Sequence, residues 1–298
     1  MKQWMLMGLL GVMGLLLLLI YAPLLVWMER VAVNRAQLGT GALLVVFTLV
    51  ISVWDRLDWK KTKPNIHPDG VAYLALAFFC LWLAARWRFL QFPLVLISFS
   101  LTLTGFLIFI FGPLSARWFL PAMGGLLAFG LLAALFPALD WPLRAVAAQG
   151  SAQVLLYLGV KVELHLYSVQ PPELVLFLHD RAFQVATECN GFGLLTSSVI
   201  LAFILALQPA LHWTRRVAVL SLAVPLALLC NALRIVSIAL TAAHTDLPYK
   251  LIHEGLGTIF ILAGLFLVWR IGARPIPACR PDDKEATAKT QGPAEGAG

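Results

Sequence analysis

The chain has 298 residues, of which 60% are hydrophobic and 12% are charged, whereas roughly a quarter of the residues in a soluble domain are charged. This composition excludes an ordinary soluble enzyme. The net charge of +7 does not indicate nucleic-acid binding, because the cations lie in short loops and in the C-terminal tail. Cations placed there orient a membrane protein and contact anionic lipid.

Eight apolar blocks predict membrane-spanning helices, since about 20 apolar residues cross a hydrocarbon core. Each block is continuous rather than alternating in polarity, which favours helices over strands. We therefore predict an all-α fold, a polytopic transmembrane helical bundle, with spans at residues 4–27, 38–54, 71–85, 90–112, 118–137, 191–208, 217–243 and 254–273. The first span is expected to be an anchor rather than a signal peptide, because no cleavage site follows its long apolar stretch.

Lysine and arginine residues set the expected orientation. If both termini are cytoplasmic, most of these cations lie on the inner side of the membrane, in line with the positive-inside rule. Residues 138–190 are more polar and then form a long extracytoplasmic loop before the sixth span. Segments 162–167 and 174–178 of this loop look strand-like or amphipathic. A connection of this length is often a functional lid or binding element.

Cysteine usage singles out one thiol. Cys80 and Cys230 lie inside apolar spans, where cysteine usually acts as a small hydrophobic residue, and Cys279 lies in the polar tail. Cys189 instead directly precedes the sixth span, where backbone N–H groups and the helix dipole stabilise a thiolate. Position alone fits an inert buried cysteine better than a nucleophile, so the case for Cys189 depends on its partners.

Asn231 and Arg234 lie three residues apart in the seventh span and therefore share a helix face. An arginine inside a span costs roughly 2.5–3.5 kcal/mol on insertion scales, so such residues tend to be paired and functional. The alternative is a structural ion pair or a side chain that reaches for the membrane surface. Arg234 is expected about ten residues, or roughly 15 Å, from the outer end of its helix. Either that helix ends earlier or the site is recessed.

His253 opens the eighth span on the outer side and is able to exchange protons near neutral pH. His244 competes with it in the same loop, and His165 and His179 lie in the long outer loop. A lone histidine at a membrane edge is more often a polar anchor than a catalyst. The pair His253–Glu254 lacks the second histidine of a zinc-protease motif, and we expect neither a metal nor a cofactor.

Three helices thus bring a thiol, a cation and a proton-transfer group to one side of the membrane. At these residues the sequence resembles the exosortase/archaeosortase family of multi-pass membrane cysteine transpeptidases, over roughly residues 140–273. The motifs that match are Cys-x-Gly (Cys189, Gly191), Asn-x-x-Arg (Asn231, Arg234) and a His shortly followed by Gly (His253, Gly255). Asn190 departs from the family pattern, in which serine is commoner.

The resemblance implies an enzyme with Cys189 as nucleophile, Arg234 stabilising the thiolate or the oxyanion, and His253 moving the proton. Asn231, Asn190 and Gly191 are expected to orient the substrate. The implied partners are the C-terminal sorting signals of exported proteins, each a short motif, a transmembrane helix and a basic tail. The cleaved protein would pass to a surface acceptor, an exopolysaccharide or a lipid, at the cell inner membrane.

The resemblance also implies a division of the chain. We expect N-terminal transmembrane helices over residues 1–137, an exosortase-like catalytic region over 138–273 and a disordered cytoplasmic tail over 274–298. Two other classes of function stay open. One is a non-catalytic membrane component of a polysaccharide assembly or transport system. The other is a transporter that binds an anion at Arg234, although the inverted repeats of that class are not visible in the sequence.

Overall fold

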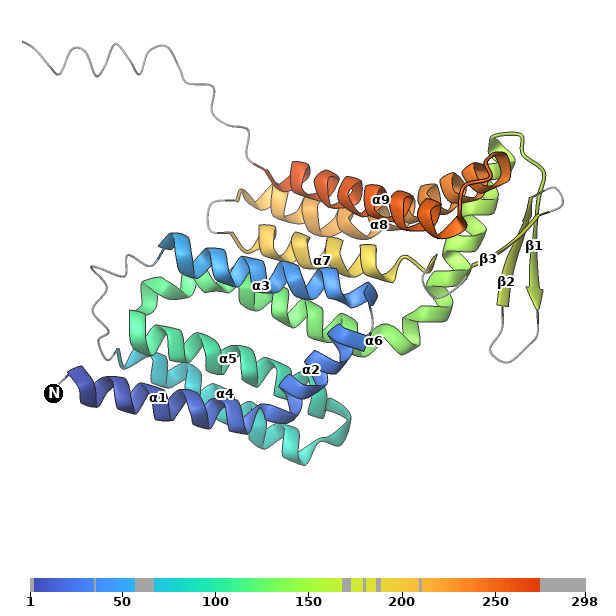
Figure 1. Cartoon of the computed structure of the whole chain (residues 1–298). Helices are drawn as coiled ribbons and strands as arrows, with labels where there is room; N and C mark the ends of the chain where they lie inside the picture. Colours follow the sequence, from blue (N-terminus) through green and yellow to red (C-terminus); the bar gives the residue numbers. More distant parts are fainter. Residues whose placement is uncertain are drawn as a thin grey trace, which may run out of the picture.

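A computed structural model describes residues 3–34, 36–56, 67–167, 173–178, 181–185, 189–208 and 211–273. The predicted tail at 274–298 lies outside these residues. The described helices are α1 (Gln3–Ile20), α2 (Ala22–Asn34), α3 (Ala36–Arg56), α4 (Asp69–Arg86), α5 (Gln91–Phe111), α6 (Pro113–Tyr157), α7 (Phe192–Ala206), α8 (Trp213–His244) and α9 (Tyr249–Gly272). They lie roughly side by side in a bundle, and α7, α8 and α9 form one edge of it (Figure 1).

Five of the described helical segments are long and apolar enough to cross a membrane, namely residues 69–86, 88–111, 119–157, 213–244 and 249–272. The bent pair of α1 and α2, whose axes meet at 65°, passes the same test as one broken span. The apolar segments Leu38–Ile51 and Phe192–Ala206 are shorter. The helical bundle is therefore confirmed with five or six spans by length and composition, and the predicted number of eight is not.

Helix α6 corrects the predicted start of the outer loop. It runs for 45 residues to Tyr157 and contains Pro121, Pro137 and Pro142, so residues 138–157 are helical. The predicted boundary between residues 137 and 138 falls inside this helix. Proline removes a hydrogen bond and bends a helix rather than always ending it. The second half of α6 turns away from the first and crosses the end of the bundle where the sheet lies (Figure 1).

A small antiparallel sheet corrects the all-α assignment. Strands β1 (Val162–Tyr167), β2 (Glu173–Leu178) and β3 (Arg181–Gln184) pair in the order β1-β2-β3. The strand-like segments 162–167 and 174–178 are confirmed as β1 and β2. Leu176 stands opposite Leu164 on one side and Phe183 on the other. Since residues on a strand alternate between faces, Leu174, Leu176 and Leu178 share one face, and all three are buried.

The sheet packs on the second half of α6 and on α8. Small side chains on α6 make this close approach possible. They form a core cluster with residues of β2, of α8 and of the segment between the sheet and α7. The cluster consists of Ala147, Ala148, Ala152, Leu174, Leu176, Val185, Cys189 and Ile235. Ser151 of α6 also donates a hydrogen bond to the Ala232 carbonyl of α8 over 3.3 Å. The segment that carries Cys189 is therefore enclosed by α6, α8 and the sheet.

Candidate functional site

The short helix α7 creates a recess at one end of the bundle. Helix α7 has 15 residues, whereas its neighbour α8 has 32. Cys189 lies just before α7 and contacts α8 at Asn231, well short of the α8 end at His244. Arg234 is ten residues before that end, or about 15 Å along the axis. Helix α8 does not end early, so the recessed alternative is the one that the structure supports.

Cys189, Arg234 and His253 come together in this recess. The Cys189 Sγ atom lies 3.5 Å from Nε2 of His253. One guanidinium nitrogen of Arg234, Nη2, lies 3.3 Å from the same Nε2 atom. The predicted cluster of a thiol, a cation and an imidazole is thus present, and a single imidazole nitrogen faces both of the other groups.

The shared contact indicates which nitrogen of His253 carries its hydrogen. A guanidinium only donates hydrogen bonds, so the contact with Arg234 requires Nε2 to be an acceptor, with the hydrogen on Nδ1. The same Nε2 faces Cys189 Sγ, and its single lone pair is able to accept the thiol proton once the contact with Arg234 opens. Proton transfer would leave a thiolate beside an imidazolium and a guanidinium, a placement of opposite charges that stabilises it.

Arg234 is buried in a way that leaves a donor unused. The residue is 8% exposed, and its Nε atom has no hydrogen-bond partner among the described residues. A buried donor without a partner costs free energy, and native proteins keep few of them. This donor is therefore available to a group that enters the recess. Asn231 Oδ1 is a second buried polar atom without a partner in the described part of the chain.

Gly191 and Asn231 hold the backbone of the Cys189 segment. The Asn231 side chain donates from Nδ2 to the Cys189 carbonyl over 3.0 Å. Gly191 has a φ of +75°, and a Cβ atom there would lie 2.4 Å from Asn231 Cγ. Glycine is needed at this position for two reasons, namely its positive φ and the close approach of Asn231. These contacts are with the Cys189 segment, and the substrate-orienting role stays a prediction.

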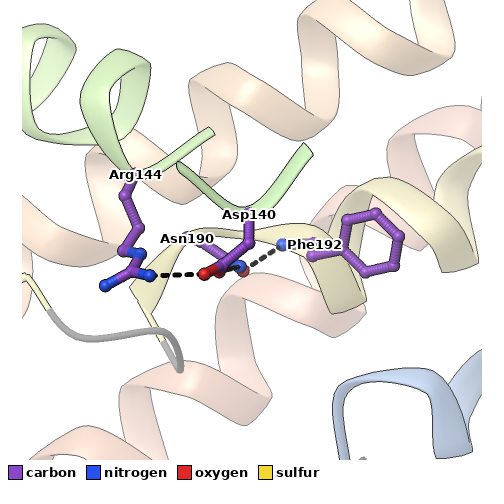
Figure 2. A network of polar contacts seen from close by, with 4 residues as sticks. All are labelled: Asp140, Arg144, Asn190 and Phe192. Atoms are coloured by element: carbon purple, nitrogen blue, oxygen red, sulfur yellow. Dashed lines mark hydrogen bonds and ion pairs between the residues drawn. The ribbon is translucent and has the colours of Figure 1, made fainter. Parts of the chain in front are cut away.

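Asn190 ties the same segment to two helices. Its Oδ1 atom accepts the Phe192 backbone N–H, the first of α7, over 2.8 Å. Its Nδ2 atom donates to Oδ1 of Asp140 on α6 over 2.6 Å. Figure 2 shows these contacts and the ion pair between Asp140 and Arg144. The first amide of α7 is thus bound by Asn190, although the sequence predicted that the amides there would favour the Cys189 thiolate.

A small apolar cavity of about 20 Å³ lies beside Cys189. The sheet, α8 and α9 each contribute to its wall. Its lining residues are Leu176, Phe183, Gln184, Val185, Cys189, Ile235, Ile238, Ala239 and Tyr249. A cavity of this size holds about one water molecule, so an apolar side chain could lie next to the thiol only if the wall residues moved.

The competing histidines and cysteines lie elsewhere. His244 contacts the Leu240 carbonyl of its own helix at 2.8 Å. His165 lies on β1, 3.1 Å from the Glu163 carboxylate. Cys80 lies in α4 and Cys230 in α8, while His179 and Cys279 are outside the described residues. No group of three metal-ligating side chains occurs among the residues that the structure describes.

Four residues of the site have no role in the sequence interpretation. Gly257 lies against Arg234, since a Cβ atom there would be 3.1 Å from Nη2, whereas Gly255 of the predicted motif faces open space. Tyr249 stacks near His253, with ring centroids 5.8 Å apart. Tyr249, His253 and Gly257 are spaced by four, so a helical face read from His253 could have found them. Asp140 and Arg144 are the other two.

A comparison with known families identifies the family of the chain. The model of the transmembrane exosortase family (Exosortase_EpsH) matches residues 27–270, most of the chain. No curated protein and no solved structure matches the chain. The matched range contains every residue of the recess described above. With its apolar helices, the chain is a multi-pass membrane protein, and it belongs to the transmembrane exosortase family.

Proposed function

We propose that the chain is a membrane-embedded cysteine transpeptidase that cleaves a C-terminal sorting signal of exported proteins and transfers them to a surface acceptor. The observation that carries this proposal is the contact of His253 Nε2 with both Cys189 Sγ, at 3.5 Å, and Arg234 Nη2, at 3.3 Å. A nucleophile beside a base that is itself oriented by a third group is the usual arrangement for covalent catalysis.

The first half-reaction is acylation. His253 Nε2 takes the proton of the Cys189 thiol, and the thiolate attacks the scissile carbonyl carbon. The new C–S bond gives a tetrahedral oxyanion. The C–N bond then breaks, and the proton held on His253 goes to the leaving amine. The products of this step are a thioester on Cys189 and the released transmembrane part of the signal.

The second half-reaction is transfer. An amine or hydroxyl of an exopolysaccharide or lipid acceptor, or water in the hydrolytic side reaction, gives its proton to His253 and attacks the thioester. The C–S bond breaks and the thiolate of Cys189 returns. Arg234 stabilises the oxyanion in both half-reactions, and its buried Nε donor without a partner suits that task. Oxyanion donors of this kind are worth about 10²–10³ in rate.

The substrate would enter from the side of the membrane on which the sheet lies. Opening of the small apolar cavity between β3, α8 and α9 would make room for a side chain next to the scissile bond. The positive-inside rule supports cytoplasmic termini and an extracytoplasmic recess. The protein would lie in the inner membrane of the cell. The transmembrane helix of the signal would dock against the bundle from the lipid.

The test is processing of an exported protein that ends in a motif, a transmembrane helix and a basic tail. The substrate is chosen from the C-termini of exported proteins in the same genome and expressed with Cys189→Ala or with wild-type enzyme. We expect the Cys189→Ala variant to leave the precursor uncleaved on immunoblots. Wild-type enzyme should give a thioester adduct that hydroxylamine releases.

Cys80→Ala is the matched control, because it removes a thiol from a span far from the recess along the chain. It should process the precursor at the wild-type rate. Wild-type processing by Cys189→Ala would show that Cys189 is not the nucleophile. Absence of a hydroxylamine-sensitive adduct while cleavage continues would argue for direct hydrolysis instead.

A further inference from the structure

The residue after the thiol, Asn190, uses both ends of its amide. The side chain is 1% exposed. Its Oδ1 atom faces a backbone donor, Phe192 N–H, and its Nδ2 atom faces a carboxylate, Asp140. Only this orientation of the amide satisfies both contacts. With Oδ1 already occupied, Nδ2 requires an acceptor from another element, and Asp140 of α6 supplies it (Figure 2).

A second partner, Arg144, holds the Asp140 side chain in place. Its Oδ2 atom accepts a hydrogen bond from Nη2 of Arg144, one helical turn further along α6. The two side chains are 17% and 15% exposed, so water screens the pair only in part. The Arg144 guanidinium also lies 5.8 Å from the ring centroid of Trp141. Asp140 therefore bonds with one oxygen to Arg144 and with the other to Asn190.

This connection fixes Cys189 from a direction that the other contacts do not cover. Asn231 holds the Cys189 carbonyl from α8, whereas Asp140 holds the following residue from α6. Residues 186–188 lie outside the described part of the chain. The contacts that the structure describes on either side of this gap therefore include those of Asn190, directly after the thiol. A thiol must stay within a few tenths of an ångström of its reacting position, because a shift of about 1 Å can cost 10²-fold in rate.

We propose that Asp140 is a positioning residue for Cys189 that acts through Asn190, and that Arg144 neutralises its charge. The proposal rests on the proposed cysteine chemistry. Arg144 matters because a lone carboxylate near the thiol would oppose formation of the thiolate. The Asp140–Arg144 pair carries no net charge, so it supplies a strong acceptor for Asn190 without that penalty. Neither residue touches the substrate in this arrangement.

The first experiment separates positioning from binding. Purified Asp140→Ala and Asp140→Asn enzymes are assayed with the substrate described above for kcat and KM. We expect Asp140→Ala to lower kcat about 10–100-fold with KM within twofold, because the substrate pocket is untouched. Asp140→Asn keeps an oxygen that can accept from Asn190, so it should recover most of kcat. Glu163→Ala, at an exposed ion pair on β1, is the control and should match wild type.

The second experiment tests whether Arg144 neutralises the charge of Asp140. The rate at which a small alkylating reagent modifies Cys189 is followed against pH in protein with Cys80 and Cys230 replaced by serine and Cys279 by alanine. Arg144→Gln leaves Asp140 without its cation, so the midpoint of the profile should move to higher pH. The double variant Asp140→Asn/Arg144→Gln should return it to the wild-type value. A purely structural role would not produce this reversal.

The two proposals fail in distinguishable ways. If Cys189→Ala is inactive but Asp140→Ala keeps the wild-type kcat, the positioning role is wrong and the proposed function stands. If Cys189→Ala processes the substrate normally, the proposed function itself is wrong. If Asp140→Ala does not fold, the Arg144→Gln and double variants decide. An unchanged alkylation midpoint in Arg144→Gln, or a midpoint that stays shifted in the double variant, would overturn the proposal.

Discussion

The guanidinium of Arg234 lies directly against Gly257, one helical turn after His253. A Cβ atom at position 257 would be 3.1 Å from Nη2 and 3.4 Å from Cζ of Arg234. Helix α9 thus presents the His253 imidazole and, four residues later, a glycine against which the Arg234 guanidinium packs. The missing side chain lets a planar group approach the helix backbone, and the contact fixes the direction in which the Arg234 donors point.

Gly257→Ala should therefore displace the guanidinium and lower kcat about tenfold, because oriented donors lose effect quickly with small shifts. Gly255→Ala is a matched control in the same helix, since a Cβ atom at position 255 meets nothing within 4 Å. Both changes replace glycine in a helix, which favours folding by up to about 1 kcal/mol. Equal activity of the two variants in the processing assay would argue against the Gly257 contact.

Arg234→Lys keeps the positive charge and loses the planar group with several donors. We expect processing to fall about 10²-fold or more, while the pH midpoint of Cys189 alkylation stays close to that of wild type. Arg234→Gln should lower processing as far and also move the midpoint to higher pH, because a cation that stabilises the thiolate is gone. Undiminished activity of the lysine variant would mean that charge alone suffices.

Gly191→Ala should destabilise the protein more than Gly159→Ala. Both glycines have positive φ, +75° and +77°, but a Cβ atom at position 159 meets open space and one at 191 collides with Asn231. Positive φ alone costs an alanine about 1–3 kcal/mol, so Gly159→Ala reports that cost. Thermal unfolding in detergent should show the lower Tm for Gly191→Ala. Similar Tm values would contradict the close packing of Gly191 on Asn231.

Ala239→Phe should fill the small apolar cavity beside Cys189, where Ala239 is 2% exposed and forms part of the wall. We expect slower processing of the protein substrate with little change in alkylation by a small reagent, because the thiol itself is untouched. Leu229→Phe is the control, since Leu229 lies in the same helix and is 52% exposed. Normal processing by Ala239→Phe would mean that the substrate does not use this pocket.

The predicted helical bundle and the three reactive residues came from signals that are local in sequence. Long apolar blocks require helices in lipid, and Cys189, Arg234 and His253 are reactive side chains placed in or beside such helices. Segments 162–167 and 174–178 were readable as strands because the first alternates apolar and polar residues and the second is a short apolar run. Strand β3 was not, since Arg181–Gln184 is too short to show a period.

The end of α6 was missed because charge was interpreted as solvent exposure. Asp140 and Arg144, with Pro137 and Pro142 beside them, look like the start of a loop. In the structure the two charges pair with each other and with Asn190 inside the site. The contact of Asp140 with Asn190 joins residues fifty positions apart, so no local pattern reveals that this pair belongs to the site. The same holds for Gly257, whose partner is on another helix.

Under the proposed function, the shortness of α7 would limit which proteins could be substrates. With Arg234 about 15 Å along α8 from the end of that helix, a folded exported domain would not rest against the reacting carbonyl if the chain acts as proposed. An extended chain rises about 3.3 Å per residue, so roughly five unfolded residues must separate the domain from the bond to be cut. A tail shortened below that length would be bound by its transmembrane helix and yet never reach the sulfur.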